Sequence, residues 1–197
     1  MSKSITATID RREFVTELVK ACPDALFVAG LGSSTYDLFA AGDRPENFYL
    51  WGAMGGAAGI GLGLALAQPS KSIVVVTGDG EQLMGLGTLA TIGTQLPPNL
   101  TIVILDNGHF GETGMQHSHS SLGTDLVAVA KACSIANSHL MSDLKAIGDI
   151  GACVNTPKQT SLFQVLVKAD DVPRALPIRD GVHIKNRFRA VLGLEPI

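Results

Sequence analysis

Short apolar runs alternate along the chain with longer stretches whose apolar residues recur at helical spacing. Two of the runs, residues 73–77 and 100–105, are rich in β-branched residues and bounded by turn formers, which is typical of buried strands. Between them, residues 82–95 carry apolar positions at helical spacing. The three segments together predict a βαβ unit, whose crossover is right-handed and whose strands are parallel.

The same alternation continues on both sides of this unit. A helix over residues 10–21 is expected to begin at Asp10, with Glu13 three residues further on as in a capping box. Further strands are expected at residues 25–29, 138–141 and 160–167, and further helices at 56–67, 125–133, 142–153 and 183–193. This order of elements predicts an α/β fold, a doubly wound and mostly parallel sheet of five or six strands with helices on both faces.

Each of the two central strands is followed by a small polar cluster. Asp79 stands between Gly78 and Gly80 after the first strand, and Asn107 follows the second. Ligands of parallel sheets bind beyond the carboxyl ends of the strands, so both side chains are expected to face one crevice. Their oxygens suit Mg²⁺ held through a ligand's phosphates, and the two glycines would let the backbone approach those phosphates. The alternative for the GDG sequence alone is a tight strand-to-helix turn.

A second turn of small residues, from Gly30 to Ser34, follows the strand expected at 25–29. The hydroxyls and amides of Ser33 and Ser34 could donate hydrogen bonds to phosphate oxygens. A plain turn into a helix, with Ser34 as the N-cap, explains the same residues. The residues themselves leave both interpretations open.

The segment after Asn107, GHFGETGMQHSHSSLGTD, has no periodicity. Long loops in compact domains are usually functional or disordered, and the glycines of this one suit a segment that orders over bound substrate. Glu112 and His109 are candidate polar contacts. His117 and His119 form an HxH pair without a third ligand nearby, so contact with solvent, substrate or a partner chain is favoured over metal binding.

Composition narrows the class of protein. The 197 residues are expected to form one domain, residues 1–197, and 46% hydrophobic and 17% charged residues favour a buried globule. The net charge of −3 gives no pull toward nucleic acid or an anionic membrane. The N-terminus lacks the apolar core of a signal peptide, and the most apolar tract, residues 53–67, is too short to span a bilayer. The three cysteines form no CxxC pair, which favours a reducing compartment. A cytoplasmic protein is therefore expected. Residues 168–197 hold six of the fifteen basic residues, for which a solvated face is favoured over contact with an anion.

The GDG sequence, the next 26 residues and the asparagine of LDNG together resemble the cofactor fingerprint of thiamine diphosphate enzymes related to pyruvate decarboxylase. The resemblance implies that Asp79, Asn107 and the backbone carbonyl of His109 bind Mg²⁺. It also implies that the carbonyl of Gly52 accepts the amino group of the cofactor and that Met54 wedges the cofactor into a bent conformation, although a lone Met is usually core filler. The expected contacts of thiamine diphosphate are Ser33, Ser34, Gly52, Met54, Gly78, Asp79, Gly80, Glu81, Asn107 and Phe110.

Within that family, the runs NFYLWGAMGGAAGIGLGLALA and GETGMQ are similar to those of sulfopyruvate decarboxylase β subunits and phosphonopyruvate decarboxylases, with departures at His109, Glu112 and Met115. The resemblance implies a lyase subunit that decarboxylates a small 2-oxo acid. The expected catalytic residues are Met54, as the wedge, and Glu112, as a polar residue of the loop. Members of the family also use a pyrimidine-binding domain that supplies an activating glutamate. An α-type partner subunit is therefore expected, in a hetero-oligomer of αβ pairs. The alternatives are a carboligase subunit resembling acetolactate synthase and a non-catalytic cofactor-binding or assembly subunit.

Overall fold

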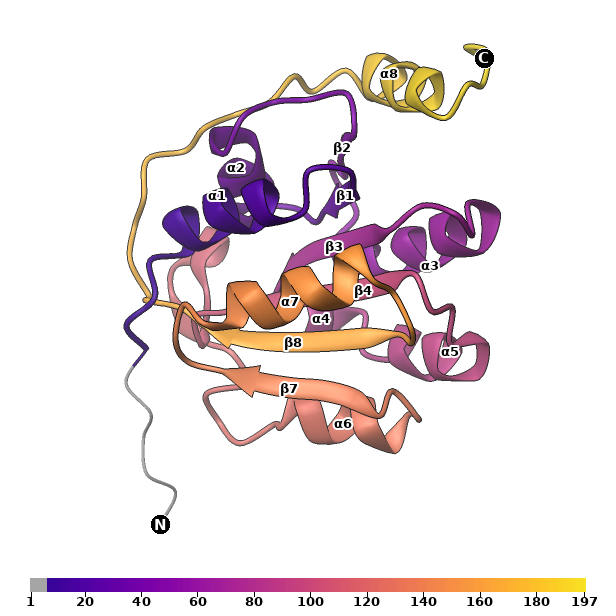
Figure 1. The fold of residues 1–197 in the computed structure, drawn as a ribbon. Coiled ribbons are helices and arrows are strands. Elements are labelled where there is room, and N and C mark those ends of the chain that lie inside the picture. Colours follow the sequence, from indigo (N-terminus) through magenta and orange to yellow (C-terminus); the bar gives the residue numbers. More distant parts are fainter. Residues whose placement is uncertain (1–6) are drawn as a thin grey trace.

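The computed structural model describes residues 7–197, which build a six-stranded sheet covered by helices on both faces (Figure 1). The strands of this sheet are β1 (Leu26–Ala29), β2 (Asn47–Tyr49), β3 (Ile73–Gly78), β4 (Leu100–Asp106), β7 (Asn137–Met141) and β8 (Ser161–Leu166). Their order is β2-β1-β3-β4-β8-β7, and all neighbours are parallel. The predicted doubly wound α/β fold is confirmed. Residues 1–6, on which the expected absence of a signal peptide partly rests, lie outside the described residues.

Helices cover the two faces of the sheet in separate groups (Figure 1). They are α1 (Arg11–Ala21), α2 (Ser33–Ala40), α3 (Ala57–Ala67), α4 (Asp79–Met84), α5 (Thr88–Gln95), α6 (Leu126–Ala132), α7 (Ala146–Asn155) and α8 (Gly181–Val191). Side chains of α1, α2 and α7 share one core with Val74 and Val76 of β3, whereas α3, α5 and α6 share the other with Ile73 and Val75. The side chains of the central strand alternate between the faces, and both faces are buried, which explains its uninterrupted apolar sequence.

Two of the expected helix starts are confirmed in detail. The carboxylate of Asp10 accepts hydrogen bonds from the backbone N–H groups of Arg12 and Glu13, both at 2.9 Å, and so caps α1. Asp125 caps α6 in the same way through the N–H of Ala128 at 2.8 Å.

Three sequence-based expectations differ from the structure. The helix expected over 82–95 is split into α4 and α5, because Gly85 packs against the backbone of Gly55: a β-carbon on Gly85 would lie 2.2 Å from the carbonyl oxygen of Gly55. The helix expected from residue 142 begins at Ala146. The loop after Asn107 contains a short hairpin, β5 (His109–Phe110) and β6 (Gln116–His117), joined through the 3-10 turn η1 (Gly111–Thr113).

The order of the strands fixes where a ligand can bind. From β1 the chain moves outward to β2, and β3 then returns to the other side of β1. The direction of winding therefore changes between β1 and β3. In doubly wound sheets the crevice at such a switch point, beyond the carboxyl ends of the strands, is where ligands bind. The turn that begins at Gly30 and the one at Gly78 both open into this crevice.

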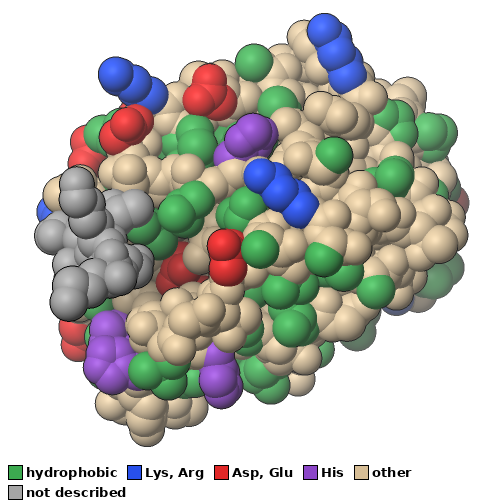
Figure 2. All heavy atoms as spheres, turned by 90° about the horizontal axis from the view of Figure 1, so that it is seen from below, with side chains coloured by type: hydrophobic (Ala, Val, Ile, Leu, Met, Phe, Trp, Pro, Cys, Tyr) green, Lys and Arg blue, Asp and Glu red, His purple; other side chains and the backbone are tan. Residues whose placement is uncertain are grey.

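The C-terminal segment lies against the edge of the sheet at β2. Phe188 of α8 packs edge-on against Phe48 at 5.5 Å between ring centres, and Arg187 forms an ion pair with Asp43 at 2.7 Å. The basic tail is therefore not a uniformly solvated face, since some of its charges are paired. Among the coloured residues in Figure 2, Lys and Arg side chains stand apart and form no continuous basic surface. Within residues 7–197, no helix is both long and apolar enough to cross a membrane.

Candidate functional site

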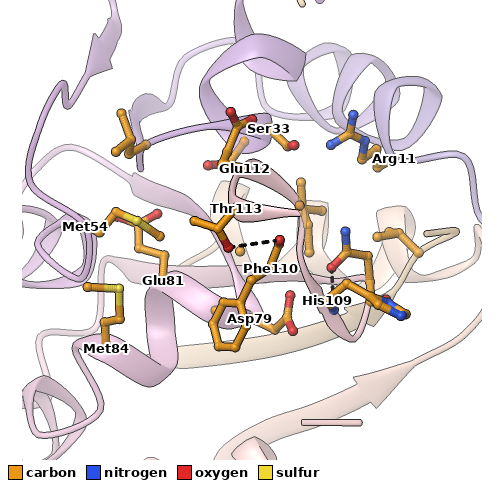
Figure 3. Close-up of a pocket in the computed structure, with 18 residues that line it drawn as sticks. Arg11, Ser33, Met54, Asp79, Glu81, Met84, His109, Phe110, Glu112 and Thr113 are labelled. Carbon is orange, nitrogen blue, oxygen red and sulfur yellow. Dashed lines mark hydrogen bonds between the residues drawn. The ribbon is translucent and has the colours of Figure 1, made fainter. Parts of the chain in front are cut away.

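A cavity of about 160 Å³ opens at the switch point between β1 and β3 (Figure 3). It brings together all of the expected site residues except Gly52. Those in its lining are Ser33, Ser34, Met54, Gly78, Asp79, Gly80, Glu81, Asn107, His109, Phe110 and Glu112. They come from the turn after β1, the segment before α3, the GDG turn after β3 and the segment after β4, so residues far apart in sequence converge at one edge of the sheet.

The segment before α3 contributes Met54 to the cavity but not Gly52. Gly52 adopts a left-handed conformation, with φ of 78°, in the turn that follows Trp51. The side chain of Met54 is 38% exposed and reaches the cavity wall (Figure 3). The interpretation of Met54 as core filler is therefore wrong.

Asp79 lies at the floor of the cavity, where it is almost fully buried and hydrogen-bonded to the loop after β4. Its Oδ2 accepts a hydrogen bond from the hydroxyl of Ser118, and the hydroxyl of Ser120 lies 3.0 Å from the same oxygen. Ser120 also lies 2.8 Å from Oδ1 of Asp106, so its single proton can serve only one of the two carboxylates at a time. Two buried acids are thus linked through two serines.

This burial has an electrostatic consequence. Burial, and then the nearby carboxylate of Asp106, raise the pKa of Asp79 from 3.8 to about 6, and the serine hydroxyls only partly oppose the shift. Asp106 is itself held by the backbone N–H of Gly108 at 2.8 Å and by the side-chain amide of Gln164 at 2.5 Å. A buried carboxylate whose ionisation is penalised in this way is stabilised strongly by a nearby cation.

Asn107 and His109 form a tight turn directly after β4. The Oδ1 of Asn107 accepts the backbone N–H of His109 at 2.9 Å, and the ring Nδ1 of His109 donates to the carbonyl of Asn107 at 2.8 Å. These bonds fix the side chain of Asn107 at the carboxyl end of β4, beside the tip of β3 that carries Asp79.

The turn after β1 leads into α2 through Gly32, which is the N-cap and adopts a φ of 80°. The alternative in which Ser34 caps this helix is therefore wrong: Ser34 lies within its first turn. Its hydroxyl is buried and, among residues 7–197, has no hydrogen-bond partner. The first N–H groups of a helix also lack intrahelical acceptors, so the start of α2 presents several unfilled donors to the cavity.

Glu81 supports the floor of the site from below the turn after β1. Its Oε2 accepts a hydrogen bond from Thr77 at 2.9 Å, and a β-carbon on Gly30 would lie 1.6 Å from that oxygen. Burial raises the pKa of Glu81. Hydrogen bonds from the Thr77 hydroxyl and from the backbone amides of Gly55 and Leu31 oppose this increase. The side chain thus ties together the segments that follow β1 and β3 and precede α3.

The segment after Asn107 folds over the cavity. The ring of Phe110 packs on Gly80, where a β-carbon would lie 2.6 Å from the ring. Glu112 contacts Gly32 and pairs with Arg174 of the C-terminal segment at 3.0 Å. The loop is therefore closed over the crevice in this structure.

Several residues of the site were not expected from the sequence. Arg11, Leu31, Met84 and Thr113 also line the cavity. Ser118, Ser120 and Asp106 lie near Asp79, and Gln164 donates a hydrogen bond to Asp106. Asp106 could have been noticed in the sequence, because it is an acid at the end of an expected strand, directly before Asn107. No pattern in the sequence indicates that a serine of the loop reaches back to the GDG turn.

The arrangement has the chemistry of a site for a phosphate-bearing ligand with a divalent cation. Hard oxygen ligands from Asp79 and Asn107 suit Mg²⁺, and the unfilled donors at Ser34 and the start of α2 suit phosphate oxygens. The buried, poorly compensated carboxylate and the orphaned hydroxyl are the two features of the molecule that such a ligand would satisfy.

Comparison with known proteins agrees with this chemistry. Residues 31–170 match the family model for the thiamine pyrophosphate enzyme, C-terminal TPP binding domain. The chain is 38% identical over 178 residues to a phosphonopyruvate decarboxylase of Streptomyces viridochromogenes, covering 88% of this chain and 43% of that protein. It is 41% identical over 127 residues to the sulfopyruvate decarboxylase subunit beta of Methanococcus maripaludis, covering 64% of this chain and 68% of that subunit.

Solved structures show the same fold. A benzoylformate decarboxylase from Polynucleobacter necessarius superposes with a TM-score of 0.68 over 88% of this chain and 36% of its own, at 18% identity. A 4-hydroxybenzoylformate decarboxylase from Rhodococcus jostii RHA1 gives a TM-score of 0.70, also at 18% identity. The chain thus spans less than half the length of these proteins and of the phosphonopyruvate decarboxylase.

Proposed function

The chain belongs to the thiamine pyrophosphate enzymes, through their C-terminal TPP binding domain, and we propose that it is the cofactor-anchoring part of a 2-oxo acid decarboxylase. The observation that carries the proposal is the buried carboxylate of Asp79 after β3, beside Asn107 after β4, in a cavity whose lining also contains the unfilled hydroxyl of Ser34. Sulfopyruvate and phosphonopyruvate are the substrate class, by analogy with the relatives named above.

Mg²⁺ would be held by Asp79, Asn107 and the backbone carbonyl of His109. Support comes from the raised pKa of Asp79, caused by burial and by Asp106, because a cation removes the penalty on the ionised form. Ser118 and Ser120 would orient the carboxylate, in the way that hydrogen-bonded neighbours orient metal ligands.

Thiamine diphosphate supplies nucleophilic attack on the 2-oxo group and storage of the electron pair left when CO₂ departs. The chain's own residues would bind and orient the cofactor and would shield the reacting centre from water. Ser33, Ser34 and the start of α2 would hold the diphosphate, and Met54 would press on the cofactor from the opposite wall of the cavity. Glu112 and Phe110, on the loop that covers the crevice, would exclude water from the reacting centre.

A partner chain is part of the proposal. The cavity of about 160 Å³ is smaller than the roughly 300–1,000 Å³ of most small-molecule sites, as expected of half a site. Met54 and Met84, which is 63% exposed, are apolar groups at its wall that a partner would cover. Several relatives are named as beta subunits. We infer an α-type subunit that brings the pyrimidine-binding domain and its activating glutamate.

The test is CO₂ release from sulfopyruvate, phosphonopyruvate and pyruvate, with thiamine diphosphate and Mg²⁺, by this chain alone and mixed with a pyrimidine-domain subunit. We expect activity only from the mixture, because Glu81 is buried against Thr77 and Glu112 is paired with Arg174, so neither acid is free to act as the activating glutamate. Rapid CO₂ release by the chain alone would contradict the division between subunits. Capture of the product by a second oxo acid or aldehyde would instead indicate a carboligase. Cofactor binding without turnover in any mixture would indicate an assembly subunit.

A further inference from the structure

Arg11 reaches the cavity because of how the N-terminal segment joins the sheet. Ile9 forms a parallel bridge to Val167, just beyond the end of β8, and accepts the backbone N–H of Lys168 at 2.9 Å. Helix α1 begins two residues later, so its first turn lies at the carboxyl edge of the sheet. The side chain of Arg11 is consequently only 5% exposed and lines the same cavity as Ser33 and Ser34 (Figure 3).

The side chain of Arg11 is held by an acid that it shares with Arg12. Its Nε lies 3.4 Å from Oδ2 of Asp37, and the Nε of Arg12 lies 3.1 Å from Oδ1 of the same carboxylate. Two guanidinium groups thus share the carboxylate of Asp37. Burial raises the pKa of Asp37, and the carboxylate of Asp10 also lies close enough to raise it. In the part of the chain that the structure describes, Arg11 Nε has no hydrogen-bond partner. This Nε is the atom that faces Asp37, so the part of Arg11 that a ligand could reach is the remainder of its guanidinium in the lining of the cavity.

The lining of the cavity also contains an orphaned donor, which is the hydroxyl of Ser34. The hydroxyl of Ser34 is buried and has no partner among residues 7–197, and the N–H groups at the start of the eight-residue helix α2 surround it. A guanidinium, a hydroxyl and free backbone N–H groups together recognise a tetrahedral oxyanion.

The charges of the lining explain why such a site is needed. Within residues 7–197, the cavity is lined by three acids, Asp79, Glu81 and Glu112, and by a single Lys or Arg, which is Arg11. Mg²⁺ on Asp79 would not by itself neutralise a diphosphate beside these acids. Arg11 is the cation in the lining that would add to the charge of the metal.

We propose that Arg11 also binds the diphosphate of the cofactor, beside Ser34, and that Asp37 is the residue that positions Arg11. The inference rests on the proposed function for the identity of the ligand. It favours the diphosphate over an anionic group of the substrate because Arg11 and Met54 lie at opposite ends of the cavity in Figure 3, and Arg11 lies at the end that carries His109.

The test compares Arg11→Gln with Arg12→Gln in the full chain. Both substitutions remove one cation from Asp37, but only Arg11 lines the cavity, so Arg12→Gln is a matched control for the ion pair. Affinity is measured by calorimetry for Mg²⁺ with thiamine diphosphate and for Mg²⁺ with inorganic diphosphate, and weak binding is followed as thermal stabilisation at millimolar ligand. We expect a loss of about ten- to hundredfold for both ligands in Arg11→Gln, and about twofold or less in Arg12→Gln.

The outcomes separate this inference from the proposed function. If the unsubstituted chain binds neither ligand, the cofactor assignment itself fails, and the role of Arg11 fails with it. If the chain binds both ligands and the two variants match it, Arg11 serves only its ion pair and the inference is overturned. If Arg11→Gln does not fold, Arg11→Lys is the deciding variant, because lysine keeps the positive charge but lacks the planar guanidinium. We expect Arg11→Lys to bind both ligands several-fold more weakly. Unchanged affinity would overturn the proposal.

Discussion

The hydroxyl of Ser118 donates a hydrogen bond to the carboxylate of Asp79, which lies 39 positions earlier in the chain. Ser118 is fully buried and belongs to the loop that covers the crevice, so the bond joins that loop to the expected metal ligand. The position of the loop and the charge of Asp79 are therefore coupled.

The first prediction concerns Ser118→Ala. Removing the donor leaves Asp79 with one fewer hydrogen bond to its ionised form, so the variant should lose about 1–2 kcal/mol of unfolding free energy at pH 7.5. The loss should shrink at pH 4.5, where the carboxyl is protonated. Ser121→Ala is the control, because Ser121 lies in the same loop but donates to the backbone carbonyl of Ser118. Equal losses at both pH values would mean that the bond does not depend on the charge of Asp79.

The second prediction is the pH dependence caused by Asp79 in the metal-free chain. Its folded-state pKa of about 6 lies above the ordinary value of 3.8, so the folded state binds more protons than the unfolded state between these values. Stability should therefore fall as the pH rises from about 4 to 6 and stay reduced above pH 6. Asp79→Asn should remove this slope and be more stable by about 2 to 3 kcal/mol at pH 7.5.

Chemical denaturation across pH 4 to 8 measures this effect as the difference between the variant and the unsubstituted chain. The raised pKa values of Glu81 and Asp37 act in the same direction and cancel in that difference. The same variant should lose Mg²⁺-dependent binding of thiamine diphosphate. A variant that is more stable and still binds the cofactor tightly would refute the role of Asp79 as a metal ligand.

The third prediction concerns Met54→Ala. Because 38% of the residue is exposed, truncation should change the unfolding free energy by less than about 1 kcal/mol. In the assembly with the pyrimidine-domain subunit, turnover should fall by about 10²-fold with a smaller change in cofactor affinity, since the side chain would set reactive geometry. Steady-state kinetics measure the turnover, and calorimetry measures the cofactor affinity. Turnover that is unchanged would exclude the wedge.

The fourth prediction concerns Gly30→Ala. The new β-carbon would lie 1.6 Å from Glu81 and must displace a buried carboxylate, which should cost roughly 1–3 kcal/mol. Gly63→Ala in α3 is the matched control: among residues 7–197, no atom lies within 4 Å of the point that its β-carbon would occupy, so it should gain up to about 1 kcal/mol from helix propensity. Thermal and denaturant unfolding of both variants test the pair, and a neutral Gly30→Ala would show that Glu81 moves freely.

Most strands of the sheet could be predicted from the sequence, but fewer of the packing contacts between its elements could. The strands around the GDG turn could be predicted because their apolar residues are buried on both faces. β2 could not, because three residues give no periodicity. The break between α4 and α5 depends on the contact of Gly85 with Gly55, which is a tertiary relationship.

The residues of the site could also be predicted only in part. Asp79 and Asn107 follow strands of the predicted sheet, so the rule for parallel strands locates them. Arg11 appeared in the sequence as one more polar residue of an amphipathic helix. Its burial depends on where the start of that helix meets β8, and no local pattern reports that contact.

The bridge between Ile9 and Val167 also bears on the order in which the protein matures. The first turn of α1 reaches its place only when β8 has joined the sheet, although the rest of α1 also packs with α2 and α7. Contacts of such long sequence separation slow folding and leave apolar surface open to aggregation. Competence to bind an anion at Arg11 should consequently arise late, in the final step of folding.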